Sequence, residues 1–160
     1  MTIMQRRKSN MPPVDMTDRP SACTVEEDKE IFSLRDSGTP SRATVDVKPR
    51  KCQKIKVDGG LNEIQPVKCD WCIRDKSNGE CLFVELKGND CLHAAEQIAN
   101  TIKWFKSTKI NPFILHKPAY IVTQSGIPKN NSQIQIAMAR LVQNVGVTLR
   151  CVHSPAKLKF

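Results

Sequence analysis

The alternation of hydrophobic and polar residues is clearest from Gln53 onward, where apolar stretches of strand length alternate with longer stretches of helical period. Five stretches are predicted as strands, at residues 53–59, 68–74, 81–88, 118–125 and 147–153. Apolar residues also recur every three or four positions after Asp90, and again from Ser132 to Asn144. This spacing predicts two amphipathic helices, the first with Asn89 or Asp90 as its N-cap.

The N-terminal third has a different pattern. Its stretch "TVEEDKEIFSLRD" opens with Thr24 and Glu27 at capping-box spacing, which predicts a short helix, and "SGTPSR" behind it has the composition of a linker. Residues 1–22 lack apolar periodicity and are predicted to be a flexible tail. We therefore expect a tail at 1–22, a short helix and linker at 23–50, and a compact domain at 51–160. The predicted order (α)βββαβαβ is an α/β fold, with a mixed sheet of about five strands flanked by helices.

The predicted second and third strands are joined by "KSNGEC", which contains the hairpin signal Asn78-Gly79. If these two residues form the turn, Asp70 lies opposite Lys87 and Cys72 lies opposite Glu85. Asp70, Glu85 and Lys87 then share one face of the sheet, with the two carboxylates as diagonal neighbours. The sequence therefore predicts a cluster of charged groups on an otherwise apolar hairpin.

Two converging carboxylates form a hard oxygen site of the kind that Mg²⁺ or Mn²⁺ prefers. Asp70 and Glu85 are the expected metal ligands, and the carbonyl of Leu86 is a possible third. Lys87 would orient a water and screen the charge that develops on a phosphate under attack. The alternative is that Asp70 and Lys87 form an ordinary solvated cross-strand ion pair, which stabilises a sheet only weakly.

The charge distribution favours a polyanionic partner. The net charge is +9 with a pI of 9.4, and residues 97–160 hold nine Lys or Arg and no Asp or Glu. A basic stretch with an aromatic residue follows the first predicted amphipathic helix and is a candidate nucleic-acid contact: Lys103, Trp104, Lys106 and Lys109. The alternative for Trp104 is packing beneath the chain that follows. No apolar run is long enough to span a membrane, and we expect a cytoplasmic protein.

These residues together resemble the PD-(D/E)XK nuclease superfamily: Asp70, then "VELKG" with Glu85 and Lys87, then a helix that carries Gln97. The resemblance spans roughly residues 53–154 and implies a restriction-endonuclease-like fold. It implies that the Asp and Glu hold Mg²⁺, that the Lys acts in catalysis and that the Gln supports the site. The chain departs from it at Cys69, where the pattern has proline, and at Thr101, where one branch often has tyrosine.

The resemblance further implies a metal-dependent endonuclease or exonuclease, more often on DNA than on RNA, with structure-specific cleavage and a homodimer as further expectations. It also implies an additional acidic ligand, for which Glu27, Glu30 and Asp58 are the candidates. His93 lies one helical turn before Gln97 and is a candidate to border the same cleft, and the alternative is an ordinary solvated histidine on the helix surface. Two other functions remain open. One is a non-catalytic module on the same fold that binds nucleic acid or protein, and the other is a zinc-dependent DNA-binding protein. The zinc ligands would come from Cys69, Cys72, Cys81, Cys91 and His93.

Overall fold

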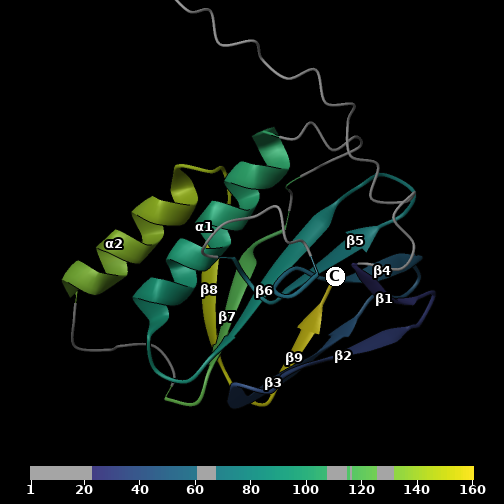
Figure 1. The fold of residues 1–160 in the computed structure, drawn as a ribbon, viewed down its shortest axis with the longest axis horizontal. Helices are drawn as coiled ribbons and strands as arrows, with labels where there is room; N and C mark the ends of the chain where they lie inside the picture. The colour runs from purple at the N-terminus through teal and green to yellow at the C-terminus, as the bar shows by residue number, and fades with distance from the viewer. Residues whose placement is uncertain (1–22, 61–67, 108–114, 116, 126–131) are drawn as a thin grey trace, which may run out of the picture.

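The structure is a computed structural model that describes residues 23–60, 68–107, 115, 117–125 and 132–160. Its main sheet has six strands in the order β1-β4-β5-β6-β7-β8, and a second sheet has three in the order β2-β3-β9 (Figure 1). The six are β1 (Thr24–Glu27), β4 (Cys52–Lys56), β5 (Trp71–Asp75), β6 (Cys81–Lys87), β7 (Ala119–Thr123) and β8 (Leu149–His153). The other three are β2 (Ile31–Asp36), β3 (Thr39–Asp46) and β9 (Ala156–Lys159), and the helices are α1 (Cys91–Ser107) and α2 (Ser132–Gln143).

The main sheet is mixed in direction. Strands β1, β4, β5 and β6 are antiparallel neighbours, whereas β7 and β8 run parallel to β6. The two parallel steps are made through α1 and α2, because parallel neighbours need a long crossover connection. The ends of β6 and β7 and the start of α1 therefore meet at one edge of the sheet.

The main sheet separates two hydrophobic cores. On one face α1 and α2 cover a core that includes Cys72, Phe83 and Ile121. On the other face lie β2, β3 and β9 (Figure 1). They cover a second core, in which Phe32 and Val45 pack with Ile73 and Leu82. Because both faces are covered, β5, β6 and β7 are buried almost throughout.

The α/β class and the order βββαβαβ from β4 to β8 are confirmed. Asp90 caps α1 as predicted, since its Oδ1 accepts a hydrogen bond from the backbone N–H of His93 at 3.0 Å. The buried positions of α1 include Ile98, Ile102 and Phe105, as its periodicity predicted. Neither α1 nor α2, the helices of the described part of the chain, is long and apolar enough to cross a membrane.

The predicted helix and linker at residues 23–50 are wrong. These residues form β1, β2 and β3, with β1 paired to β4 in the main sheet. Asp28, at a φ of 52°, lies in the bend that separates β1 from β2. In β2, Phe32 and Leu34 are buried while Ile31, Ser33 and Arg35 are exposed, which is the period-2 alternation of a strand. The sheet of about five strands is therefore six strands, and a second sheet covers its other face. The predicted tail at 1–22 lies outside the described residues.

Candidate active site

The loop between β5 and β6 determines which residues of the two strands lie opposite one another. Residues 76–79 form it, and the Asp75 carboxylate accepts hydrogen bonds from the backbone N–H and the hydroxyl of Ser77 at 2.8 and 2.7 Å. Gly79 has a φ of +74°, whereas Asn78 is not among the residues with positive φ. The predicted two-residue turn is therefore wrong, because a type I′ turn needs positive φ at both central residues.

The observed register differs from the predicted one by two residues. Trp71 lies opposite Val84, and Cys72 lies opposite Phe83 rather than Glu85. An even shift leaves each side chain on its predicted face of the sheet. Continuing the observed register by one residue places Asp70 opposite Glu85 rather than Lys87. The two carboxylates are thus direct rather than diagonal neighbours, which brings them closer than predicted.

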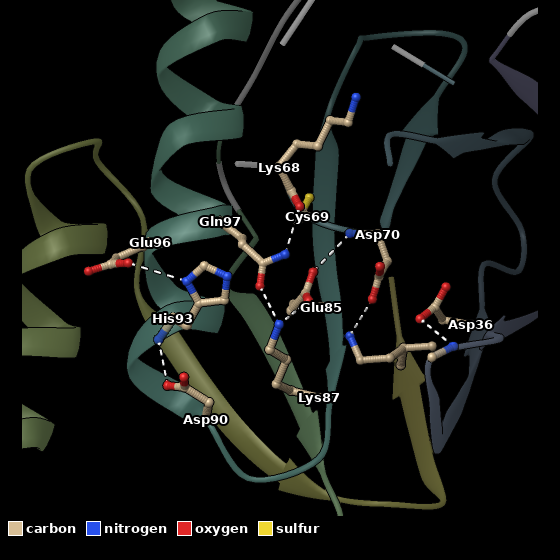
Figure 2. Close-up of polar contacts among 12 residues, drawn as sticks. Asp36, Lys68, Cys69, Asp70, Glu85, Lys87, Asp90, His93, Glu96 and Gln97 are labelled. Carbon is tan, nitrogen blue, oxygen red and sulfur yellow. Dashed lines mark hydrogen bonds and ion pairs between the residues drawn. The ribbon is translucent and has the colours of Figure 1, made fainter. Parts of the chain in front are cut away.

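Each of the two carboxylates is bound by the backbone of the other residue's strand (Figure 2). The backbone N–H of Asp70 donates to Glu85 Oε2 at 2.9 Å, and the backbone N–H of Leu86 donates to Asp70 Oδ2 at 2.8 Å. Asp70 is 7% exposed and Glu85 is 2% exposed. The interpretation of these groups as a solvated ion pair is therefore wrong.

Lys87, at the end of β6, and Gln97, within α1, complete the cluster. Lys87 Nζ donates to Gln97 Oε1 at 2.8 Å and lies 3.7 Å from Glu85 Oε1. The Gln97 amide donates in turn to the Lys68 carbonyl at 3.0 Å, so that it ties the chain before Asp70 to the lysine. Figure 2 shows the side chains of Glu85, Lys87 and Gln97 pointing toward one another. Gln97 thus contacts Lys87, as a residue that supports the site would, and its catalytic role stays a prediction.

Thr101 stands one turn after Gln97 on α1 and has a structural role. Its hydroxyl accepts a hydrogen bond from the Cys69 backbone N–H at 2.9 Å and donates to the Gln97 carbonyl. Together Gln97 and Thr101 fix the chain directly before Asp70 against α1. Thr101 therefore supports the site even though the chain departs from the superfamily pattern at this position.

Burial raises the pKa of both carboxyl groups. The pKa of Asp70 rises to about 6, chiefly by desolvation, with the hydrogen bond from Leu86 opposing and the charges of Asp36 and Asp58 adding to the rise. The pKa of Glu85 rises to about 9, by desolvation and then by the negative charge of Asp70, against the opposing charge of Lys87. Without a counter-ion, the two groups cannot both carry a charge at neutral pH without cost.

The oxygen atoms of Asp70 and Glu85 are the type of ligand that a hard divalent cation such as Mg²⁺ prefers. Each uses one oxygen for a backbone N–H, and the second oxygen accepts no hydrogen bond from the described residues. Asp70 Oδ1 and Glu85 Oε1 would hold the ion, with waters completing a coordination that Mg²⁺ usually shares between protein and solvent. No group of three His, Cys, Asp or Glu in the described residues is arranged to hold a metal by protein ligands alone. The carbonyl of Leu86 as a third ligand stays a prediction.

A cavity of about 160 Å³ opens beside Asp70, on the side toward the second sheet. Its lining includes Asp58, after β4, and Asp36, at the end of β2. Asp58 was one of the predicted additional acidic residues, and its position beside Asp70 is compatible with that role. Asp36 was missed, because residues 23–50 were interpreted as a helix and linker. In the sequence, the apolar residues Phe32 and Leu34 alternate with polar ones, and this pattern was the signal that would have placed Asp36 at the end of a strand.

The other predicted acidic ligands lie elsewhere. Glu27, in β1, accepts a hydrogen bond from the Gln53 side chain, and Glu30 forms an ion pair with Lys48 at 3.0 Å. Both predictions are wrong because the helix that was to carry them is a pair of strands. His93 lies at the exposed start of α1 beside Glu96, with 3.4 Å between Nδ1 and Oε2, and no described contact joins it to the carboxylates (Figure 2).

The residues of α1 that were predicted to contact nucleic acid lie in different surroundings, some exposed and some packed or hydrogen-bonded. Lys103 is exposed. Trp104 packs partly against the helical core and stacks edge-on with Phe105, which agrees with the packing alternative. The amine of Lys106 donates to the Val145 carbonyl. Lys109 lies outside the described residues.

The cysteines offer no zinc site within the described chain. Five of them are buried in the helical core: Cys23, Cys69, Cys72, Cys81 and Cys91. Burial raises the pKa of Cys69 and Cys72 well above the usual thiol value, which disfavours the thiolate that binds zinc. Neither they nor His93 belong to a group of three potential metal ligands among the described residues.

Comparison with known proteins gives no relative for this chain: no family model, no curated protein and no solved structure matches it. The function is therefore argued from the site alone.

Proposed function

We propose that the chain is a nuclease that uses Mg²⁺ or Mn²⁺ to hydrolyse phosphodiester bonds, with DNA a better substrate than RNA. The observation that carries this proposal is the arrangement of Asp70, Glu85, Lys87 and Gln97. Two buried carboxylates are fixed by backbone hydrogen bonds, and beside them a lysine is held by a helix glutamine. Burying such groups is costly, and a site that binds a cation and an anionic substrate offsets that cost.

Each residue has a distinct task in this proposal. Asp70 and Glu85 bind the divalent cation through the oxygens that the backbone leaves free. The cation supplies Lewis-acid chemistry, which makes a water more acidic and neutralises charge on the scissile phosphate. Lys87 is aimed by Gln97 and stabilises negative charge on the phosphate in the transition state. Gln97 acts through Lys87 and is a positioning residue.

The element order supports a relation to the restriction-endonuclease-like fold, which belongs to the same proposal. The first carboxylate directly precedes the middle strand of a meander, the Glu-x-Lys pair lies on the third strand, and the glutamine lies on the crossover helix that follows. The second sheet is a departure, since the sequence pattern predicted a short helix and a linker in the segment that forms β2 and β3. A homodimer, which would bring two sites to one substrate, stays a prediction.

The test is a cleavage assay on linear, branched and single-stranded DNA and on RNA, with Mg²⁺ or Mn²⁺. We expect Lys87→Met and Glu85→Gln to lower kcat at least about a hundredfold, as removing one group that stabilises the transition-state charge does. Lys76→Met is the matched control, because Lys76 lies in the loop at the far end of the β5–β6 hairpin and pairs with Asp28. Calorimetric titration with Mn²⁺ should show binding to the wild type that Asp70→Asn abolishes.

Three results decide against the proposal. If the wild type binds DNA but neither cuts it nor binds Mn²⁺, the chain is a non-catalytic binding module. If Lys76→Met loses as much activity as Lys87→Met, the site has been misassigned. About one equivalent of zinc in protein purified without chelator would favour the zinc-dependent alternative.

A further inference from the structure

The outer face of the second sheet carries an excess of positive charge beside the candidate active site. Arg35 on β2, Arg42 on β3, and Lys157 and Lys159 on β9 are all exposed on this face. They alternate with Phe32, Leu34, Ala43, Val45, Ala156 and Leu158, which point into the core between the sheets. We call these four residues the basic face.

The charges are arranged across the strands in a way that costs stability. Arg35 and Arg42 are direct partners in the antiparallel β2–β3 register, and like charges directly opposite one another destabilise a strand pair. Neither guanidinium forms an ion pair with another described residue, whereas Lys48 and Lys54 nearby are paired with glutamates. A surface needed only for solubility has no reason to place two unpaired arginines side by side.

The two lysines of β9 extend the positive charge of the basic face. Lys157 lies beside Thr44 and Lys159 beside Asp46, in the parallel β3–β9 register. Asp46 is the one acidic partner in this part of the face, and its Oδ1 accepts a hydrogen bond from the Lys48 backbone N–H. Among the described strand partners of these four positive side chains, Asp46 is therefore the single carboxylate, while Asp36 and Asp58 lie with Arg35 in the lining of the cavity beside Asp70.

The basic face reaches the candidate active site at its Arg35–Arg42 end. The Arg35 carbonyl accepts a hydrogen bond from the Trp71 indole, directly after Asp70, and Arg35 lines the same cavity as Asp70. Ser41, beside Arg42, donates from its hydroxyl to the Lys87 carbonyl at 2.7 Å. The Arg35–Arg42 end of the basic face thus lies beside Asp70 and beside the end of β6 that carries Lys87.

We infer that the basic face binds the sugar-phosphate backbone of duplex DNA and delivers it to the Asp70–Glu85 site. This inference rests on the proposed function for what happens at that site, but not for binding itself. Phosphate contacts from Arg and Lys position a duplex and supply affinity that falls with salt. The face therefore takes the role that the sequence had led us to expect of Lys103 and its neighbours, on the opposite side of the main sheet.

The test measures binding separately from cleavage, with a fluorescent 20-base-pair duplex and Ca²⁺ in place of Mg²⁺, over a range of salt concentrations. The variant Arg35→Gln/Arg42→Gln should raise Kd at least about tenfold and reduce the slope of log K against log salt by about two, since each phosphate contact contributes about 0.9. The charge-retaining Arg35→Lys/Arg42→Lys should bind within about threefold of the wild type, because it keeps both phosphate contacts. The control is Lys76→Gln/Arg140→Gln, which removes two exposed charges, one from the far end of the β5–β6 hairpin and one from α2. Circular dichroism and Tm confirm that each variant is folded.

The outcomes separate this inference from the proposed function. If the control weakens binding as much as the arginine variant, or if the arginine variant binds like the wild type, the basic face is not the DNA site, whatever the cleavage assay shows. If the wild type binds no duplex, the inference is also overturned. If the arginine variant alone loses binding while the wild type does not cut, the inference stands and the nuclease proposal falls.

Discussion

At Glu85, burial and a neighbouring carboxylate act in the same direction on the protonation of the side chain. Both raise the pKa of Glu85, to about 9. Burial, with the charges of Asp36 and Asp58 adding to it, raises the pKa of Asp70 to about 6. In the unfolded chain both groups have ordinary values near 4. The folded state therefore holds protons that the unfolded state releases, and the two groups link stability to pH.

The sign of this linkage follows from the raised pKa values. The contribution of the pair to stability is fully present below about pH 4 and is lost as pH rises through about 6 and then about 9. We expect the free energy of unfolding of metal-free protein to fall between pH 5 and pH 9. Glu85→Gln, which keeps an oxygen for the Asp70 backbone N–H, should remove on the order of 2 kcal/mol of that fall.

Urea denaturation in EDTA at several pH values measures this effect, with the exposed carboxylate variant Glu96→Gln as control. Glu96→Gln should leave the pH profile of the wild type in place. A Glu85→Gln protein as pH-dependent as the wild type would show that Glu85 is not the group held in its protonated form.

The residues of the site were largely predictable, but their geometry was not. Asp70, Glu85 and Lys87 could be placed on one face because side chains alternate along a strand, and an even error in register preserves that face. The position of Asp70 directly opposite Glu85 was not predictable, because it depends on a loop whose conformation the Asp75 side chain selects. Asp36 was not predictable while its strand was mistaken for a helix.

At the scale of elements, the β5–β6 loop fixes the register of the site. Its conformation depends on Gly79 at a φ of +74° and on Asp75, which binds the Ser77 backbone. Arg50 binds both Asp75 and Glu80 and so holds the two strands together where the loop joins them. The sequence pair Asn78-Gly79 indicated a turn correctly, but the choice between two and four loop residues was made by side chains around it.

Replacing the glycine of this loop tests its conformation. Gly79→Ala should lower the free energy of unfolding by about 1–2 kcal/mol, because an L-residue with a side chain is strained at positive φ. Gly88→Ala is the matched control, since no atom lies within 4 Å of the added Cβ and its φ is not in the positive range. Equal losses for the two variants in urea denaturation would contradict the four-residue loop.

The elements from β4 to β8 were predictable because each had one dominant period, of two or of about 3.6 residues. The first strands were not, because the capping-box spacing of Thr24 and Glu27 competed with a short alternation in "IFSLRD". β9 was also missed, since it is a four-residue strand in which Ala156 and Leu158 alternate with lysines. Short edge elements depend on tertiary pairing more than on local pattern.

At the scale of the whole molecule, the second sheet is part of the fold on which the site depends. It covers the face of the main sheet opposite the helices (Figure 1), and its members come from both ends of the described chain. β3 lies between β2 and β9, so the segment at 23–50 is joined to the C-terminal residues. A domain that began at Lys51 would expose the core formed by Ile73, Leu82 and Val84.

This dependence can be measured with two adjacent residues of β2. Phe32 is fully buried between the sheets, whereas Ile31 is 54% exposed on the other face of the same strand. Phe32→Ala should lower the free energy of unfolding by about 3–5 kcal/mol, as truncation of a buried aromatic side chain does. Ile31→Ala should change it by about 0.5 kcal/mol or less, because it leaves the core intact. If urea denaturation gives Phe32→Ala as small a loss as Ile31→Ala, the second sheet packs only loosely. The domain would then begin near Lys51 after all, and Arg35 and Arg42 would have no rigid support beside the site.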